Sequence, residues 1–196
     1  MSSCSDEFEE MKVQLREKGY QEKDVTISSG KAMALGVLYA LPFVMISGFM
    51  YRFWLIGRAH LSEVSGPSFY IMFLMIIVIS TIIHEFLHGI GWAVSSGSRS
   101  VFRININAMM PSCACKTALR RKQYLIGVLT PFIVLGIGSV LFILIYPGTV
   151  SILTMLVNFV AAGADLMIAV NVLKEREQDS LIVDHPTKAG YIIFYK

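Results

Sequence analysis

The sequence predicts an all-α membrane protein with about four transmembrane helices, a small β-hairpin-like element in the loop 99–115 and a strand in the C-terminal tail. Two observations predict this class. The chain of 196 residues is 55% hydrophobic and only 16% charged, whereas soluble domains carry about 45–50% apolar and about 25% charged residues. The apolar residues are also concentrated in four long runs. This composition excludes a disordered chain and argues against an ordinary cytosolic domain.

Each apolar run is long enough to cross a bilayer as a helix, which takes about 20 residues. The runs are 32–51, 69–94, 124–146 and 150–173. Pro131 predicts a kink in the third run, and Tyr146-Pro147-Gly148-Thr149 predicts a tight turn that makes the last two spans an antiparallel hairpin. We expect a cytoplasmic N-terminal segment over 1–31 and one membrane-embedded domain over 32–196, ending in a cytoplasmic tail over 174–196.

The distribution of positive charge predicts the topology. With four spans, the segments 1–31, 95–123 and 174–196 share one side, and they hold every Lys and Arg except Arg52 and Arg58. Positive residues remain in the cytoplasm, so both termini should be cytoplasmic in a multi-pass protein of the plasma membrane. No cleaved signal peptide is visible before the first span. Because topology accounts for the basic residues, nucleic acid is not an expected partner.

The polar segments at the two ends of the chain carry weaker patterns. Residues 5–18 predict a short amphipathic helix, because Phe8, Met11 and Leu15 fall on one face at helical spacing. The acidic side of this helix is read as a solvated face. Residues 24–29 are expected to be extended.

The loop after the second span shows strand periodicity. Ser100–Ile106 alternates in polarity, and Pro111 interrupts the segment 108–115 that follows. A second strand is predicted over Tyr191–Tyr195. Two interpretations of Ser100–Ile106 are open: it pairs with an extended substrate as an added strand, or it is an ordinary interfacial hairpin.

Four ionisable residues interrupt the predicted spans when tyrosine is set aside: His84, Glu85, His88 and Asp165. An ionisable group at membrane depth is costly, so each indicates function. The first three form the pattern H-E-x-x-H. Residues four apart share a helix face, so His84 and His88 can bind one Zn²⁺, while Glu85 can take a proton from a zinc-bound water. The alternative is that these side chains satisfy one another in the bundle core.

Asp165 is the candidate third zinc ligand. His84 and Asp165 lie about 15 Å and about 12 Å from the inner ends of their spans, at 1.5 Å per residue, so their depths match. The alternative is a polar contact with another span. The small residues Gly163 and Ala164 should let the fourth span approach the second span, and Gly89 and Gly91 should do the same from the other side.

Other candidates have weaker support. Asn158 is a candidate substrate-binding residue that hydrogen-bonds a substrate backbone, or else a contact between helices. Cys113 and Cys115 form C-x-C, for which free cytoplasmic cysteines are favoured over a metal site. Asp184-His185-Pro186 predicts a turn that helps to fold the tail against the membrane face.

The motifs described above together resemble those of a known family. An H-E-x-x-H pattern within a span and an Asp late in the last span resemble the site-2-protease class of membrane metalloproteases. The chain is more similar to small bacterial membrane proteins of the zincin peptidase family, long held as a domain of unknown function. The resemblance is carried by His84–Gly89, Pro111–Cys115, Thr130-Pro131, Gly163-Ala164-Asp165, Asp184-His185-Pro186 and Gly190-Tyr191.

The resemblance implies zinc ligation by His84, His88 and Asp165, with Glu85 as acid and base. Asp165 is followed by Leu166, where site-2 proteases have an Asp-Gly pair. We therefore expect a zinc metalloendopeptidase with one Zn²⁺ that hydrolyses peptide or membrane-protein substrates within the membrane. The alternative is an inactive membrane scaffold or chaperone that retains the metal site; the presence of Glu85 argues against it, because a scaffold has no chemical need for a general base.

Overall fold

The computed structural model describes residues 4–55, 66–106, 111–175, 179–186 and 188–196. It is mostly helical, and four helical stretches are long and apolar enough to cross a membrane. These are α2 (Ser29–Met50, continued by a π-helical turn over Tyr51–Leu55), α3 (Pro67–Ser96), α4 (Arg121–Ile145) and the pair α5 (Thr149–Ala161) and α6 (Gly163–Lys174). The four predicted apolar runs fall within these helices, apart from Tyr146, which follows α4, and Ala162, which lies between α5 and α6.

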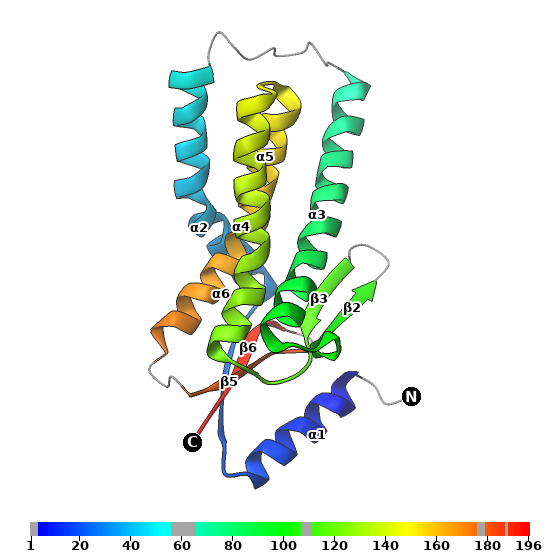
Figure 1. Ribbon diagram of the computed structural model, residues 1–196, viewed down its shortest axis with the longest axis vertical. Coiled ribbons are helices and arrows are strands. Elements are labelled where there is room, and N and C mark those ends of the chain that lie inside the picture. The colour runs from blue at the N-terminus through cyan, green and yellow to red at the C-terminus, as the bar shows by residue number, and fades with distance from the viewer. Residues whose placement is uncertain (1–3, 56–65, 107–110, 176–178, 187) are drawn as a thin grey trace.

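The fourth stretch is two helices rather than one. The interruption lies at Ala162, whose backbone has φ −75° and ψ −4°, and α6 leaves the direction of α5 at this point (Figure 1). Helix α4, in contrast, continues through Pro131 without interruption. The sequence analysis predicted a kink at Pro131 and one continuous fourth span, so it did not anticipate this break.

Small residues bring the helices together, but in different pairs from those predicted. Gly163 and Ala164 lie against Gly36 of α2, in the first span. Gly91 of α3 lies against Gly127 of α4, in the third span. The expectation that these residues join the second and fourth spans was therefore wrong. Small residues identify a close approach, but their spacing along one helix does not identify the partner.

Strands and the remaining helix gather at one end of the helical bundle (Figure 1). Helix α1 (Cys4–Glu17) and strand β1 (Gln21–Ile27) precede α2, and β2 (Phe102–Ile106) pairs antiparallel with β3 (Pro111–Cys115). The strands β4 (Leu119–Arg120), β5 (Leu181–Asp184) and β6 (Ala189–Tyr195) complete a four-stranded antiparallel sheet of order β1-β6-β5-β4.

These elements confirm the predicted N-terminal helix, the hairpin in the loop 99–115 and the strand in the tail. Strands β4 and β5 were not predicted from the sequence, and neither was the pairing of β1 with β6. The part of the predicted segment 108–115 that precedes Pro111 lies outside the described residues. The three segments predicted to share the cytoplasmic side do lie at the same end of the bundle (Figure 1).

The four-stranded sheet is packed on both faces, which explains why the tail strand β6 is so apolar. Ile192 and Phe194 pack with Phe8 and Leu15 of α1, whereas Tyr191 and Ile193 pack against the ends of α3 and α4. Successive residues of a strand point to opposite faces, so β6 needs apolar side chains at every position. The predicted apolar face of α1 is therefore buried on the sheet. The tail is thus fixed between α1 and the ends of α3 and α4.

Candidate metal centre

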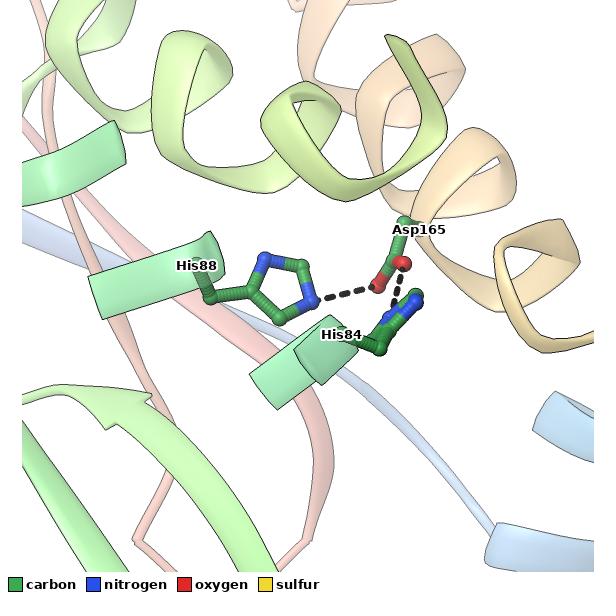
Figure 2. Close-up of side chains that lie close together, drawn as sticks. All are labelled: His84, His88 and Asp165. Carbon is green, nitrogen blue, oxygen red and sulfur yellow. Dashed lines mark ion pairs between the residues drawn. The ribbon is translucent and has the colours of Figure 1, made fainter. Parts of the chain in front are cut away.

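Two histidines of α3 and one aspartate of α6 lie in contact. His84 Nε2 is 2.9 Å from Asp165 Oδ2, and His88 Nε2 is 3.5 Å from Asp165 Oδ1. Figure 2 shows both imidazole rings directed at the carboxylate. One ligand atom from each residue lies within 4.8 Å of the other two. The structure therefore brings together the three residues predicted as zinc ligands.

The backbone explains how these side chains meet. His84 and His88 are four residues apart on α3, so they project from the same face one turn apart. Asp165 lies in the first turn of α6, directly after the break at Ala162. The N-terminal end of a helix carries a partial positive charge, which stabilises a carboxylate in its first turn. The break thus directs Asp165 toward α3 and supplies a favourable electrostatic environment.

His88 is held in a fixed orientation by its neighbours. Its Nδ1 lies 3.0 Å from the carbonyl oxygen of Gly127 on α4, and its ring stacks on Trp92 with centroids 5.4 Å apart. The indole Nε1 of Trp92 donates to the carbonyl oxygen of Tyr124, at 3.1 Å. An Nδ1–H bonded to a carbonyl leaves Nε2 as the free lone pair, which is the usual arrangement behind a zinc-binding histidine.

Glu85 is positioned from a different element. Its Oε2 accepts a hydrogen bond from the backbone N–H of Cys113 on β3, at 2.5 Å. It is half-buried and lines the same cavity as the two histidines. The hairpin β2–β3 therefore fixes one carboxylate oxygen of Glu85, and Oε1 has no such backbone partner among the described contacts.

The residues present fit a zinc ion. Two imidazoles and one carboxylate are a donor set of catalytic zinc sites. Tetrahedral ligands at about 2.0–2.1 Å from a metal lie about 3.3 Å from one another, which is close to the two observed separations. His84 and His88 are each only 6% exposed, and the buried Asp165 Oδ2, which faces His84 Nε2, has no hydrogen-bond partner in the described structure. Buried polar groups without partners are costly, so a cation among them would stabilise the cluster.

A cavity of about 430 Å³ opens onto this cluster. It is lined by residues of α3, α4, α6 and β3, and by residues of the hairpin β5–β6. The lining residues from that hairpin are Asp184, His185, Pro186, Lys188 and Gly190. This volume lies in the range of small-ligand sites. The arrangement places the cluster of His84, His88 and Asp165 and the carboxylate of Glu85 beside space for a small ligand.

The tail contains a cavity residue that the sequence analysis did not identify as functional. Asp184-His185-Pro186 forms the predicted turn, closed by a hydrogen bond from His185 N–H to Gly190 O. Asp184 accepts hydrogen bonds from the hydroxyl of Tyr124 at 2.5 Å and from the N–H of Cys115 at 2.7 Å. Burial raises the pKa of Asp184 to about 6, although both hydrogen bonds oppose the shift. The sequence signal that could have identified Asp184 is its position as a single acid directly after the apolar residues Leu181–Val183.

The other predicted candidates lie elsewhere. Asn158 is buried between α5 and α4, where its Nδ2 donates to Ser139 Oγ at 3.2 Å, and it is not among the residues that line the cavity. Contact with a substrate therefore remains a prediction for this residue. Cys113 and Cys115 are free thiols, and burial raises the pKa of Cys113 to about 12. A thiol that stays protonated is a poor metal ligand.

Comparison with known proteins gives one finding that bears on this site. A protein-family profile described as "Putative zincin peptidase" matches residues 77–179. The matched segment contains α4, α5, both histidines, Glu85 and Asp165, and it ends before β5. The comparisons find no matching curated protein and no matching solved structure.

Proposed function

Because the chain belongs to this zincin peptidase family, whose profile matches more than half of its length, we propose that it is a zinc metallopeptidase that hydrolyses peptide bonds of membrane-associated substrates. The observation that carries the proposal is the buried cluster of His84, His88 and Asp165, which lies beside Glu85 in one cavity. Such a cluster is expensive in an apolar environment, and metal binding explains why it is present.

His84, His88 and Asp165 would hold a single zinc ion, since they supply three protein ligands and catalytic zinc sites leave a further position open. When bound, zinc supplies Lewis-acid chemistry, which polarises a carbonyl and makes water acidic near neutral pH. Glu85 accepts the proton of the attacking water as general base and then delivers it to the leaving amine as general acid. The N–H of Cys113 restricts the rotation of Glu85 by holding Oε2, so Oε1 exchanges the proton.

The reaction is proposed to occur within the membrane. His84 and Asp165 lie within two of the four helices that are long and apolar enough to span a bilayer. The polar elements gather at one end of the bundle (Figure 1), where Cys113 of β3 contacts Glu85. The segments 1–31, 95–123 and 174–196 at this end carry every Lys and Arg except Arg52 and Arg58. By the positive-inside tendency this end is cytoplasmic, so water and a peptide substrate reach the zinc site from the cytoplasmic side of a plasma membrane.

The test compares wild type with Glu85→Gln after purification in detergent. Zinc content is measured for each protein, together with cleavage of a mixed library of membrane peptides. Glu85→Gln should retain zinc and lose about 10²- to 10⁴-fold in cleavage rate, which is the usual contribution of a general base. Glu9→Gln is the matched control, because Glu9 is exposed on α1 and pairs with Lys12 at the surface.

Two results would overturn the proposal. Equal cleavage by wild type and Glu85→Gln would remove Glu85 from the chemistry. Stoichiometric zinc without any cleavage by wild type would favour the alternative, a membrane scaffold that retains the metal site.

A further inference from the structure

A carboxylate in the tail joins three elements of the cavity wall. Asp184, the last residue of β5, accepts from the hydroxyl of Tyr124 on α4 and from the backbone N–H of Cys115 on β3. Tyr124 is fully buried, and Cys115 is 1% exposed. Each oxygen of Asp184 therefore has one donor, and both donors belong to buried residues.

Strand β3 contacts both Asp184 and the proposed general base, Glu85. Cys113 and Cys115 are two residues apart on β3, and their N–H groups point to the same edge of the strand. Cys113 donates to Glu85, and Cys115 donates to Asp184. The opposite edge of β3 is paired with β2, where Ala114 lies opposite Arg103. The position of the Cys113 N–H, and hence of Glu85, therefore depends on how firmly Asp184 fixes the edge of β3.

Resting on the proposed peptidase function, we propose that Asp184 is a positioning residue for Glu85: it fixes β3 through the Cys115 N–H, so that the Cys113 N–H holds the Glu85 carboxylate at the zinc site. Asp184 itself accepts no proton from the substrate in this role. The residue lies beyond the segment 77–179 that the family profile matches. The C-terminal hairpin β5–β6 is thereby assigned a part in catalysis.

The aromatic residues around Asp184 strengthen this link. Tyr124 stacks on Trp92 with centroids 6.1 Å apart, and Trp92 stacks on His88. Tyr191 of β6 also contacts the Tyr124 ring, with centroids 6.1 Å apart. Tyr124 thus contacts both the tail and Trp92, on which His88 stacks. Asp184 therefore accepts a hydrogen bond from a residue that packs against the support of His88.

Three substitutions separate positioning from other roles. Asp184→Ala removes both acceptors. Asp184→Asn can retain both bonds, because its amide oxygen accepts from Cys115 N–H and its NH₂ donates to the Tyr124 oxygen. Asp184→Glu retains the charge but moves the oxygens by one methylene. Positioning therefore predicts that Asn preserves catalysis better than Glu, whereas a role for negative charge predicts the reverse order.

The experiment measures kcat and KM per bound zinc, and hydrogen exchange of the 112–116 amides in both zinc-loaded and zinc-free protein. Asp184→Ala and Asp184→Glu should lower kcat about 10- to 100-fold, as a small misplacement of a catalytic group does, with KM and zinc content unchanged. Both should speed exchange in β3 about tenfold or more. Asp184→Asn should stay within about threefold of wild type in both measurements. Asp179→Ala, an exposed change in the same tail, is the matched control.

The outcomes distinguish the two proposals. If wild type carries zinc but cleaves nothing, the proposed function fails, and the exchange of β3 in the zinc-free variants still decides whether Asp184 fixes this strand. Unchanged exchange in Asp184→Glu, or full kcat per zinc in Asp184→Ala, overturns the positioning role. If Asp184→Ala does not fold, the comparison of Asn with Glu gives the same decision.

Discussion

Replacing Gly163 with alanine should weaken zinc binding, although Gly163 is not a ligand. Gly163 is the first residue of α6, two positions before Asp165. An added Cβ would overlap the backbone carbonyl of Gly36 on α2 and lie 3.2 Å from Ala40 Cβ. Neither obstacle is the far end of a flexible side chain, so α6 must shift away from α2 and carry Asp165 with it.

Two opposing effects set the change in the free energy of unfolding, and a third effect sets the change in zinc affinity. Alanine in place of glycine stabilises a helix by about 1 kcal/mol, whereas overpacking costs about 1–3 kcal/mol, so the free energy of unfolding should fall by at most about 2 kcal/mol. Zinc binding is more sensitive, because ligand distances must hold within about 0.2 Å. We expect zinc affinity to fall about 10- to 100-fold, as it does when groups that orient ligands are lost.

The assay is competition with a chelator for zinc in detergent-purified protein, together with thermal unfolding. Gly138→Ala is the matched control, because its added Cβ meets nothing within 4 Å and it shares the gain in helix propensity. The reasoning is refuted if Gly163→Ala and Gly138→Ala bind zinc with the same affinity.

Stability should depend on pH through Asp184, whose pKa is about 6 in the folded protein against an ordinary 3.8. Folding favours the protonated acid, so this contribution is complete below about pH 4 and is lost as pH rises through 6, a change of roughly 3 kcal/mol. Asp184→Asn should abolish that part of the pH profile in chemical unfolding; an identical profile would contradict the assignment. Gly127→Ala should displace the Trp92 indole that its Cβ would overlap, disturb the stacked His88 and lower zinc affinity about 10- to 100-fold. Equilibrium dialysis against zinc measures this, and an affinity equal to that of Gly138→Ala would count against the role of the stack.

The cluster of His84, His88 and Asp165 could be predicted from the sequence for two reasons. Helix geometry fixes which residues share a face, and ionisable side chains are costly to bury in an apolar helix. The spacing of His84 and His88 fixes their shared face on any helix. Besides His84, Glu85 and His88, Asp165 is the one ionisable residue in the apolar runs when tyrosine is set aside, and its depth matches that of His84. The structure places its carboxylate in contact with both imidazoles.

The partners of the small residues were predicted incorrectly for a physical reason. A glycine on a helix removes a side chain and allows close approach from any neighbour. Which helix fills the space at Gly163 depends on the direction of α6, and that direction is set by the break at Ala162. No proline or glycine marks the break at position 162 itself.

The C-terminal tail was also predicted only in part. The sequence predicted a strand over Tyr191–Tyr195 and a turn at Asp184-His185-Pro186. It did not reveal that β5 and β6 form a sheet with β1, because pairing between segments so far apart leaves no local periodicity. Nor did it show that Asp184 meets Tyr124 and Cys115, since those contacts join three separate elements.

By itself the sequence determined four apolar helices, the end of the bundle where the charges gather, and the identity of the residues that can bind zinc. These follow from helix period, apolar length and the cost of burying charge, which are properties of short segments. Only the tertiary structure decided which helices pack together, that α6 begins at Gly163, and that the N–H of Cys113 and the carboxylate of Asp184 belong to the site. These depend on contacts between residues far apart in the chain, whose free energy is gained only once the chain has folded.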